Sequence, residues 1–470
     1  MLKIRKLLRA SVAAAGAAVL GATGTLAIAA PAKAPTPPMG WNSWDAYGLT
    51  ITEEQFKANA TILARMKKHG WNTAVVDEGW YMANPLGTKL QDRDYKYDPY
   101  GRLMPVPARF PSAADGNGLK ALAAWTHKQG LKFGVHIVRG IPRAAVDANM
   151  PIENSRFHAQ DAAVKSDICP WDDSNYGVAD NAAGQAYYTS LIRQYQSWGV
   201  DFLKVDCISD HPYKPTEIRQ IATAIAEVAP SMLLSLSPGP TSLSHQAEVA
   251  RYSQMWRIMD DLWDSWVFPH PDPKTTFPNG IRNAFNSLAQ WNPFVQSGQW
   301  PDADMLPFGS LRPHPGWGDP RASRLTEAET RTAFTLWSIA RSPLILGGNL
   351  TEAPGYLMQI LTNDRVIALN QDDRVSRPVQ TLPASLASAR VWVSGSRGVT
   401  PDTVAIFNVG EGPLRVDAAW AELGLPAGRY PVCDLWKGAI HAASDHATET
   451  IPSHDVALLT VGSKVGCKKK

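Results

Sequence analysis

A repeated unit of helix, glycine and short apolar strand is the feature of this sequence that most narrows its possible folds. Glycine readily takes the left-handed conformation that ends a helix, and an uninterrupted apolar run is typical of a strand buried on both faces. The unit therefore predicts helices that alternate with parallel strands. Its clearest copies are Gly70 before residues 74–77, Gly130 before residues 133–136 and Gly199 before residues 202–206.

Continuing this pattern along the chain gives eight candidate strands. Two of the intervening helices begin with a capping-box pattern, at Thr52 with Gln55 and at Thr326 with Glu329. Eight parallel strands close a (β/α)8 or TIM barrel; an open doubly wound sheet, the alternative, calls for a GxGxxG fingerprint that is absent after the first strand. We therefore predict an α/β fold with a TIM barrel. The candidate strands are residues 39–44, 73–80, 132–139, 202–207, 232–237, 255–260, 300–306 and 343–347.

The pattern changes after Asp373 to short, alternating apolar segments separated by Gly, Pro and Asp. This pattern is typical of an antiparallel β-sandwich. We place the catalytic barrel in residues 35–375 and the C-terminal sandwich in residues 376–470. The candidate sandwich strands include residues 390–393, 404–407, 430–433 and 456–459.

The first 34 residues contain five Lys or Arg and no acid, and an Ala-, Val- and Leu-rich run spans residues 11–30. Basic residues before such a run, with small-residue sites after it, are typical of a signal peptide. A membrane anchor is the alternative, but the run is weakly hydrophobic and prolines follow it. We predict a signal peptide over residues 1–34 and a secreted or periplasmic protein. No later segment approaches the roughly 20 apolar residues that span a bilayer, so no membrane contact is expected after cleavage.

The charge balance excludes a nucleic-acid-binding body. The chain has 46 Lys and Arg against 43 Asp and Glu, and removing the five basic residues of the first stretch leaves 41 against 43. A mature chain with a net charge near −2 has no basic excess with which to hold phosphates, so no nucleic-acid partner is expected. The oligomeric state stays open.

Four cysteines suit an exported protein with up to two disulfides. Their spacing matches neither a CxxC zinc site nor a redox motif. Of the three possible pairings, proximity along the chain favours Cys169 with Cys207 and Cys433 with Cys467, and the sequence alone does not decide between them.

Carboxylates dominate the positions where the candidate strands end, which in a TIM barrel build the active site. No metal-ligand spacing, GxSxG or P-loop pattern is present, so neither a metal nor a cofactor is expected. Cooperating carboxylates with aromatic neighbours, in a chain with 17 tryptophans, indicate hydrolysis of an uncharged sugar that can stack on a ring. In chain order these positions are Trp44 with Asp45, Asp77 with Glu78, His136 with Arg139, Lys204 with Asp206, Arg257 with Asp260 and Asp261, and Asp302 with Asp304.

Five motifs at successive strand ends together resemble the α-galactosidases of glycoside hydrolase family 27, over essentially all of residues 36–460. The resemblance implies a barrel followed by a β-sandwich and a retaining exo-glycosidase that releases terminal α-D-galactose from galactosides, with a carbohydrate as its partner and no cofactor. The motifs are PMGWNSW at 38–44, VDEGW at 76–80, LKVDC at 203–207, WRIMDD at 256–261 and WPDADML at 300–306.

The same resemblance implies that Asp206 is the nucleophile and that Asp261, four residues after Arg257, is the acid/base. Asp260 is the alternative acid/base. Neighbouring side chains of an extended strand point to opposite faces, so only one of the two aspartates is expected to face the sugar. A retaining pair requires carboxyl groups roughly 5–5.5 Å apart, against about 6.5–9.5 Å for an inverting pair.

The resemblance further implies contacts with the sugar. Asp77 is expected at O4 and O6 of galactose, Lys204 at O3 and O4, and Arg257 near O2, with Trp44 as the stacking platform.

Several residues have a structural interpretation beside the functional one. His136 either lines the site or is a hydrogen-bonded structural histidine. Asp304 either supports the acid/base or caps the next helix. Trp41 and Trp80 are expected to fill the barrel core.

The chain departs from the family pattern in two places. Glu78 stands where the family commonly has a second aspartate, and its extra methylene could intrude on the sugar's hydroxymethyl group. β-L-Arabinopyranose has galactose-like hydroxyls without that group, so β-L-arabinopyranosidase, an activity also found in the family, is the alternative function. Residues 235–239, SLSPG, lack the acidic or aromatic residues that many members place near O2.

A catalytically inactive carbohydrate-binding protein is the alternative outside the enzymes. Such a protein would keep the barrel and its tryptophans, but it would not need both Asp206 and Asp261. Their joint presence favours an enzyme.

Overall fold

The eight predicted barrel strands form one parallel sheet in the computed structural model, which describes residues 33–86, 93–269, 277–312, 319–462 and 467. The sheet order is β10-β9-β8-β7-β3-β2-β1-β13. Beyond β10, the backbone N–H of Leu306 donates to Ile345 at 2.7 Å, and Leu306 bridges Leu346 in parallel, which closes the ring. The predicted TIM barrel is confirmed. Its strands are β1 Met39–Asn42, β2 Thr73–Val76, β3 Lys132–Val138, β7 Phe202–Asp206, β8 Leu233–Leu236, β9 Met255–Arg257, β10 Trp300–Asp302 and β13 Leu344–Leu346.

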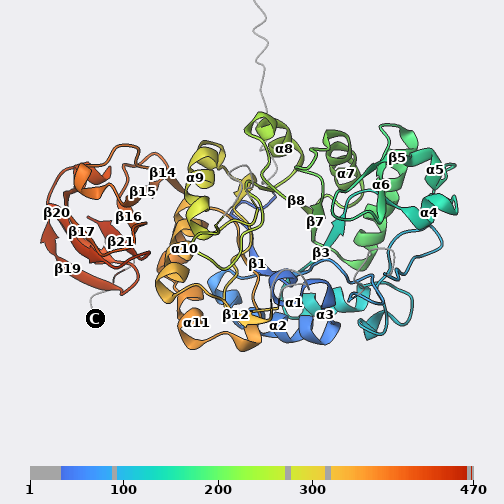
Figure 1. Ribbon diagram of the computed structural model, residues 1–470, viewed down its shortest axis with the longest axis horizontal. Helices are drawn as coiled ribbons and strands as arrows, with labels where there is room; N and C mark the ends of the chain where they lie inside the picture. Colours follow the sequence, from blue (N-terminus) through green and yellow to red (C-terminus); the bar gives the residue numbers. More distant parts are fainter. Residues whose placement is uncertain (1–32, 87–92, 270–276, 313–318, 463–466, 468–470) are drawn as a thin grey trace, which may run out of the picture. The chain divides into compact units, whose positions relative to one another are not determined.

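Helices surround these strands (Figure 1). Both predicted capping boxes are present, with Thr52 and Gln55 satisfying each other's backbone N–H groups and Thr326 and Glu329 doing the same. No helix in the described part of the chain is both long and apolar enough to cross a membrane. The α-helices are α1 Trp44–Tyr47, α2 Glu53–Arg65, α3 Lys120–Lys128, α4 Arg143–Asp147, α5 Ala159–Ala162, α6 Ala182–Trp198, α7 Pro215–Val228, α8 Gln246–Tyr252, α9 Ile281–Trp291, α10 Glu327–Ala340, α11 Gly355–Leu361 and α12 Asp364–Gln371.

Two small antiparallel sheets interrupt the barrel pattern. Sequence periodicity did not predict them, because their strands are short and lie in long loops. The first, in the order β4-β6-β5, separates β3 from α6, and the predicted disulfide from Cys169 to Cys207 ties the loop between β5 and β6 to the end of β7. The strands are β4 Ile141–Pro142, β5 Ala163–Ile168 and β6 Asn175–Val178 in one sheet, and β11 Ser310–Leu311 and β12 Arg321–Ala322 in the other.

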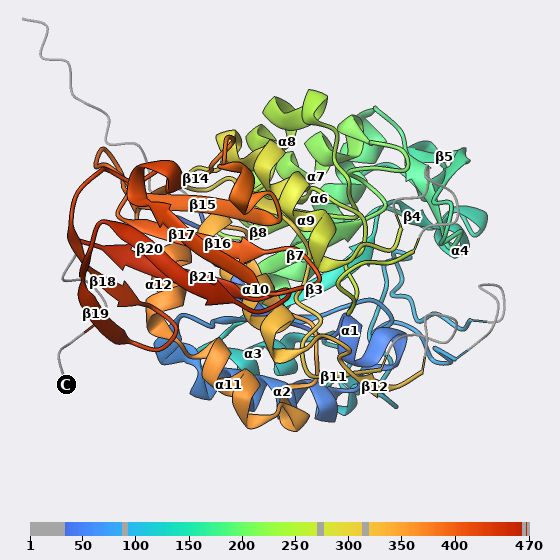
Figure 2. The same cartoon turned by 60° about the vertical axis from the view of Figure 1, so that its left-hand side comes forward.

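The C-terminal segment is antiparallel, as predicted for a β-sandwich. One sheet has the order β14-β15-β16-β21-β18-β19, and β17 pairs with β20 in a second (Figure 2). The second predicted disulfide joins Cys433 to Cys467. The strands are β14 Arg374–Pro378, β15 Ala389–Ser396, β16 Thr403–Asn408, β17 Leu414–Ala419, β18 Tyr430–Asp434, β19 Ala439–Ser444, β20 His446–Ile451 and β21 Val456–Val461.

Polar contacts join helix α10 to the sandwich. Arg331 holds Asp455 through two hydrogen bonds of 2.9 and 2.8 Å, and Thr332 donates to the carbonyl of His454 at 2.6 Å. The helix that precedes the last barrel strand thus also supports the C-terminal sheet. The predicted signal peptide, residues 1–34, lies outside the described residues except for its last two.

Close packing of β1 against β2 requires glycine at position 40. A Cβ atom on Gly40 would lie 2.2 Å from the carbonyl oxygen of Thr73, and that oxygen belongs to the neighbouring strand, so it cannot swing away. We expect Gly40→Ala to lower the free energy of unfolding by at least about 2 kcal/mol, measured by urea denaturation. Gly355→Ala is the matched control, because its Cβ meets nothing within 4 Å; we expect a change below about 1 kcal/mol. Equal stabilities of the two variants would contradict this account of the packing.

Candidate active site

The carboxyl ends of the barrel strands open into one cavity of about 460 Å³. All nine side chains that the sequence indicated for catalysis or sugar binding line it. Parallel strands bring their ends to the same edge of the barrel, which is why residues far apart in the chain meet here. They are Trp44, Asp77, Glu78, His136, Lys204, Asp206, Arg257, Asp261 and Asp304.

Asp77 is a firmly held carboxylate at the floor of the cavity, by which we mean its most buried part. Its Oδ2 accepts hydrogen bonds from Asn42 Nδ2 at 2.7 Å and from Lys204 Nζ at 2.9 Å, and its Oδ1 accepts from the backbone N–H of Glu78 at 2.8 Å. Burial opposes ionisation, but the charges of His136 and Lys204 and these hydrogen bonds outweigh it and hold the pKa of Asp77 well below its usual range. Asp77 is therefore a fixed anion.

Asp206 is a second carboxylate held in its ionised form. Its Oδ1 accepts from the backbone N–H of Cys207 at 2.6 Å, and its Oδ2 lies 3.4 Å from His136 Nε2 and 3.3 Å from Ser237 Oγ. Burial again opposes ionisation, but the hydrogen bond from His136 and the charges of His136 and Lys204 lower the pKa of Asp206. His136 thus contacts a site carboxylate and lines the cavity.

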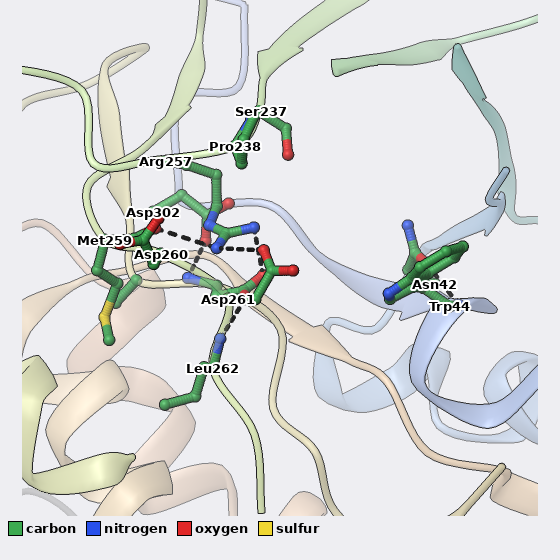
Figure 3. A network of polar contacts seen from close by, with 12 residues as sticks. Asn42, Trp44, Ser237, Pro238, Arg257, Met259, Asp260, Asp261, Leu262 and Asp302 are labelled. Atoms are coloured by element: carbon green, nitrogen blue, oxygen red, sulfur yellow. Dashed lines mark hydrogen bonds and ion pairs between the residues drawn. The ribbon is translucent and has the colours of Figure 1, made fainter. Parts of the chain in front are cut away.

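The surroundings of Asp261 favour its protonated form, in contrast to those of Asp206. Arg257 Nη2 donates to its Oδ1 at 3.2 Å (Figure 3). Arg257 Nη1 also pairs with Asp304 at 2.9 Å, so one guanidinium serves two carboxylates. Burial raises the pKa of Asp261; Arg257 opposes this, and the charges of Asp304 and Asp206 add to it, giving a pKa of about 6. Asp261 therefore keeps its proton over a wider pH range than Asp206 does.

Asp304 fixes the backbone beside Asp261 and does not cap a helix. Its Oδ2 accepts from the backbone N–H of Leu262 at 2.8 Å, and its own N–H donates to Asp302 Oδ1 at 2.9 Å. Burial, together with the charge of Asp304 and against that of Arg257, raises the pKa of Asp302 to about 7.

Both Asp260 and Asp261 line the cavity, so the alternation of side chains along an extended strand does not separate them. Strand β9 ends at Arg257, so the two aspartates lie in the following turn, where the alternation of an extended strand no longer applies. Which of the two faces the sugar stays a prediction.

Two further acids of the cavity, the half-buried Glu78 and the buried Asp45, lie in surroundings that favour their neutral form. Burial, followed by the charge of Asp172, raises the pKa of Glu78 well above its usual value. Burial, followed by the charge of Asp304, does the same for Asp45, whose Oδ2 has no hydrogen-bond partner among the described residues.

Some tryptophans near the site pack in the barrel core and another lines the cavity, as the sequence indicated. Trp41 and Trp80 are fully buried and donate to the carbonyls of Gly348 and His136 at 2.8 and 2.9 Å. Trp44 lines the cavity instead, and its backbone N–H donates to Asn42 at 2.9 Å. Figure 3 places Trp44 across an open space from Asp261.

The sequence missed several residues that line the cavity from loops. Arg93, Asp172, His211 and Phe277 follow no strand directly, so neither periodicity nor strand-end position pointed to them. Asp45, by contrast, is one of the strand-end positions that the sequence indicated, and it lines the cavity. Among the described residues, no group of three His, Cys, Asp or Glu side chains is arranged to hold a metal ion.

Comparison with known proteins agrees with this geometry. The family model described as Alpha galactosidase A matches residues 171–372, and the one described as Alpha galactosidase C-terminal beta sandwich domain matches residues 387–461. A crystal structure of a GH27 β-L-arabinopyranosidase from Geobacillus stearothermophilus has 38% sequence identity and a TM-score of 0.83, covering 93% of this chain and 98% of that one. The chain belongs to glycoside hydrolase family 27.

Other relatives in family 27 carry different names. A putative α-N-acetylgalactosaminidase from Bacillus halodurans C-125 has 34% identity and a TM-score of 0.77, over 91% of this chain and 97% of that one. An α-galactosidase from Oryza sativa subsp. japonica is 26% identical over 430 residues, which are 90% of this chain and 84% of the relative. Family membership alone therefore does not select one sugar.

Arg139 positions the backbone around Asp206 without lining the cavity. Its Nε donates to the carbonyl of Cys207 at 2.7 Å, and its backbone N–H donates to the carbonyl of Asp206 at 3.1 Å. The guanidinium is buried and is held by Glu217 and Asp167, each at 2.8 Å. Cys207 has a φ of +59°, a conformation that a residue with a side chain adopts only when its surroundings enforce it.

We expect Arg139→Lys to keep the charge but lose this fork of hydrogen bonds, which lets the Asp206 backbone relax. Glycosidase kcat should fall by about tenfold to a hundredfold with KM within about twofold of wild type, measured by steady-state kinetics on a folded variant. Arg219→Lys is the matched control, because Arg219 forms an exposed pair with Asp180. An Arg139→Lys enzyme with wild-type kcat would show that the network serves stability alone.

Proposed function

We propose that the protein is a retaining exo-glycosidase that removes terminal β-L-arabinopyranose and, less efficiently, terminal α-D-galactose. The observation on which this choice rests is Glu78, a half-buried acid that lines the cavity directly after Asp77. The two sugars share the configuration of their ring hydroxyls, and the pentose lacks the hydroxymethyl group for which the longer glutamate side chain leaves less room. The 38% identity with a β-L-arabinopyranosidase supports the same choice.

α-D-Galactosidase activity is the second candidate. Both matching family models carry α-galactosidase descriptions, and the rice relative is an α-galactosidase. Of the sugar contacts implied by the family resemblance, those of Lys204 with O3 and O4 and of Asp77 with O4 serve hydroxyls that both sugars possess, and only the contact of Asp77 with O6 is particular to galactose. A cavity built on these contacts therefore admits galactose wherever Glu78 can move aside.

The proposed reaction is a double displacement between two carboxylates. Asp206, held ionised, attacks the anomeric carbon while Asp261 gives its proton to the departing glycosidic oxygen, so the bond to the leaving group breaks as the bond to Asp206 forms. Asp261, now ionised, then takes a proton from water, and the resulting hydroxide displaces Asp206 from the sugar. Two inversions give net retention.

The substrate preference follows from Glu78. We expect wild-type kcat/KM to be higher for p-nitrophenyl β-L-arabinopyranoside than for p-nitrophenyl α-D-galactopyranoside, with retained configuration in the first product seen by NMR. Glu78→Asp removes one methylene and should shift the ratio toward galactose by about tenfold or more. A wild-type preference for the galactoside would make α-galactosidase the function, and an inverted first product would reject the double displacement.

The two carboxylates also predict a pH profile. As pH rises through about 6, Asp261 loses the proton that it must give away, so kcat/KM should fall; the low pKa of Asp206 should keep activity into the acidic range. Asp261→Asn has no proton to lose, so its residual kcat/KM on the p-nitrophenyl glycosides should lack this alkaline limb. With a glycosyl fluoride, whose leaving group needs no proton, kcat/KM of Asp261→Asn should recover toward the wild-type value, while kcat stays low because no base then takes the proton from water.

Asp260→Asn is the matched control and should retain the alkaline limb. If Asp260→Asn loses the limb and Asp261→Asn keeps it, the two roles are reversed. Asp206→Asn should abolish turnover of every substrate; sugar binding without turnover in the wild type would instead favour the inactive carbohydrate-binding protein.

A further inference from the structure

Side-chain exposure orders the cavity by depth. The side chains of Asp77, His136 and Asp304 are 2–4% exposed, those of Asp206 and Asp261 are 17% and 26% exposed, and that of His211 is 50% exposed. A sugar held by the floor therefore has its anomeric carbon at the level of Asp206 and Asp261. The group that leaves must extend from there toward the more exposed residues at the cavity mouth.

Trp171 stands at this mouth and is unusual among the tryptophans. It is 44% exposed, and it is the only tryptophan among the exposed large hydrophobic residues in the described part of the chain. Of those exposed residues, only Trp171 and Phe277, which is 43% exposed, line the cavity. An aromatic ring left in water beside a binding cavity is typical of a surface that a ligand covers.

Covalent and polar contacts fix Trp171 relative to the site carboxylates. The Cys169–Cys207 disulfide joins the residue two positions before Trp171 to the residue directly after Asp206. On the other side of Trp171, Asp172 is buried and accepts from the backbone N–H of Ser174 at 2.8 Å. The backbone is therefore fixed on both sides of the exposed ring, as a binding platform requires.

The surroundings of Trp171 select the chemistry of its ligand. The edge of His211 meets the ring, with centroids 6.1 Å apart and an angle of 75° between the planes, and His211 Nδ1 lies 2.9 Å from Asp210. Asp260 also lines the cavity. An apolar ring face with polar groups around it suits a pyranose, which presents C–H bonds on its face and hydroxyls at its edge.

We propose that Trp171 is the platform of a subsite for the leaving group, and that this group is a pyranose unit of an oligosaccharide or polysaccharide. The inference rests on the proposed function, because it assumes that Asp206 and Asp261 act on the bond between the two sugars. It adds a residue that determines specificity for the leaving group: Trp171 favours a sugar over a small non-sugar aglycone.

The test compares substrates with and without a sugar leaving group in wild type, Trp171→Ala and Trp171→Phe. β-L-Arabinopyranosyl fluoride and α-D-galactosyl fluoride occupy only the floor of the cavity, whereas disaccharides of the same two sugars linked to galactose also reach the rim. We expect Trp171→Ala to lower kcat/KM for the disaccharides by about tenfold or more, and to leave the fluorides within about twofold. Trp171→Phe keeps a flat ring and should retain most disaccharide activity.

Turnover of the fluorides also reports that each variant is folded. A parallel loss on fluorides and disaccharides, or no loss on either, would overturn the subsite. A wild-type enzyme that hydrolyses neither fluoride would overturn the proposed function and this inference together, a pattern that a missing subsite cannot produce.

Discussion

The shortage of positive charge in the cavity is the constraint on which the rest of the site depends. Eight Asp or Glu side chains line it, against three Lys or Arg. Burial makes an uncompensated anion costly, so the few cations decide which acids ionise. Lys204 bonds directly to Asp77 and, together with the larger effect of His136, lowers the pKa of Asp206, whereas the charge of Arg257 is shared between Asp261 and Asp304. At Asp45 and Glu78, burial outweighs the attraction of the cations and raises the pKa of both, which favours the neutral form.

The barrel is what makes such crowding possible. Most of the strands contribute one or two polar side chains at their ends or directly after them. Asp77 follows β2 and Asp206 ends β7, and both approach His136 of β3 because these three strands are neighbours in the sheet. The repulsion between these like charges destabilises the fold, and burial of the hydrophobic interior offsets it. The largest side chains of that interior, Trp41 among them, are fully buried.

Sequence patterns predicted the parts of the molecule that periodicity and strand-end position determine. The eight barrel strands, the sandwich strands and the acids at strand ends, such as Asp77 and Asp206, are of this kind. Asp172 and Arg93 belong to loops whose course depends on long-range contacts, including the disulfide that begins at Cys169, and no local pattern encodes those contacts. The sequence also did not predict that β9 ends at Arg257, before Asp260, for a related reason: packing, and not composition, sets the position where this strand ends.

The opposite roles proposed for Asp206 and Asp261 depend on how the charges of their neighbours are themselves compensated. Asp304 occupies one arm of Arg257 at 2.9 Å, the shorter of the two contacts, so the guanidinium is less able to ionise Asp261 at 3.2 Å. Asp206 faces His136 and Lys204, and its backbone neighbour Cys207 adds an N–H donor at 2.6 Å. Two carboxylates that share one cavity are thus driven apart in pKa by their second neighbours, and a retaining glycosidase needs this difference to begin its reaction with one anion and one acid.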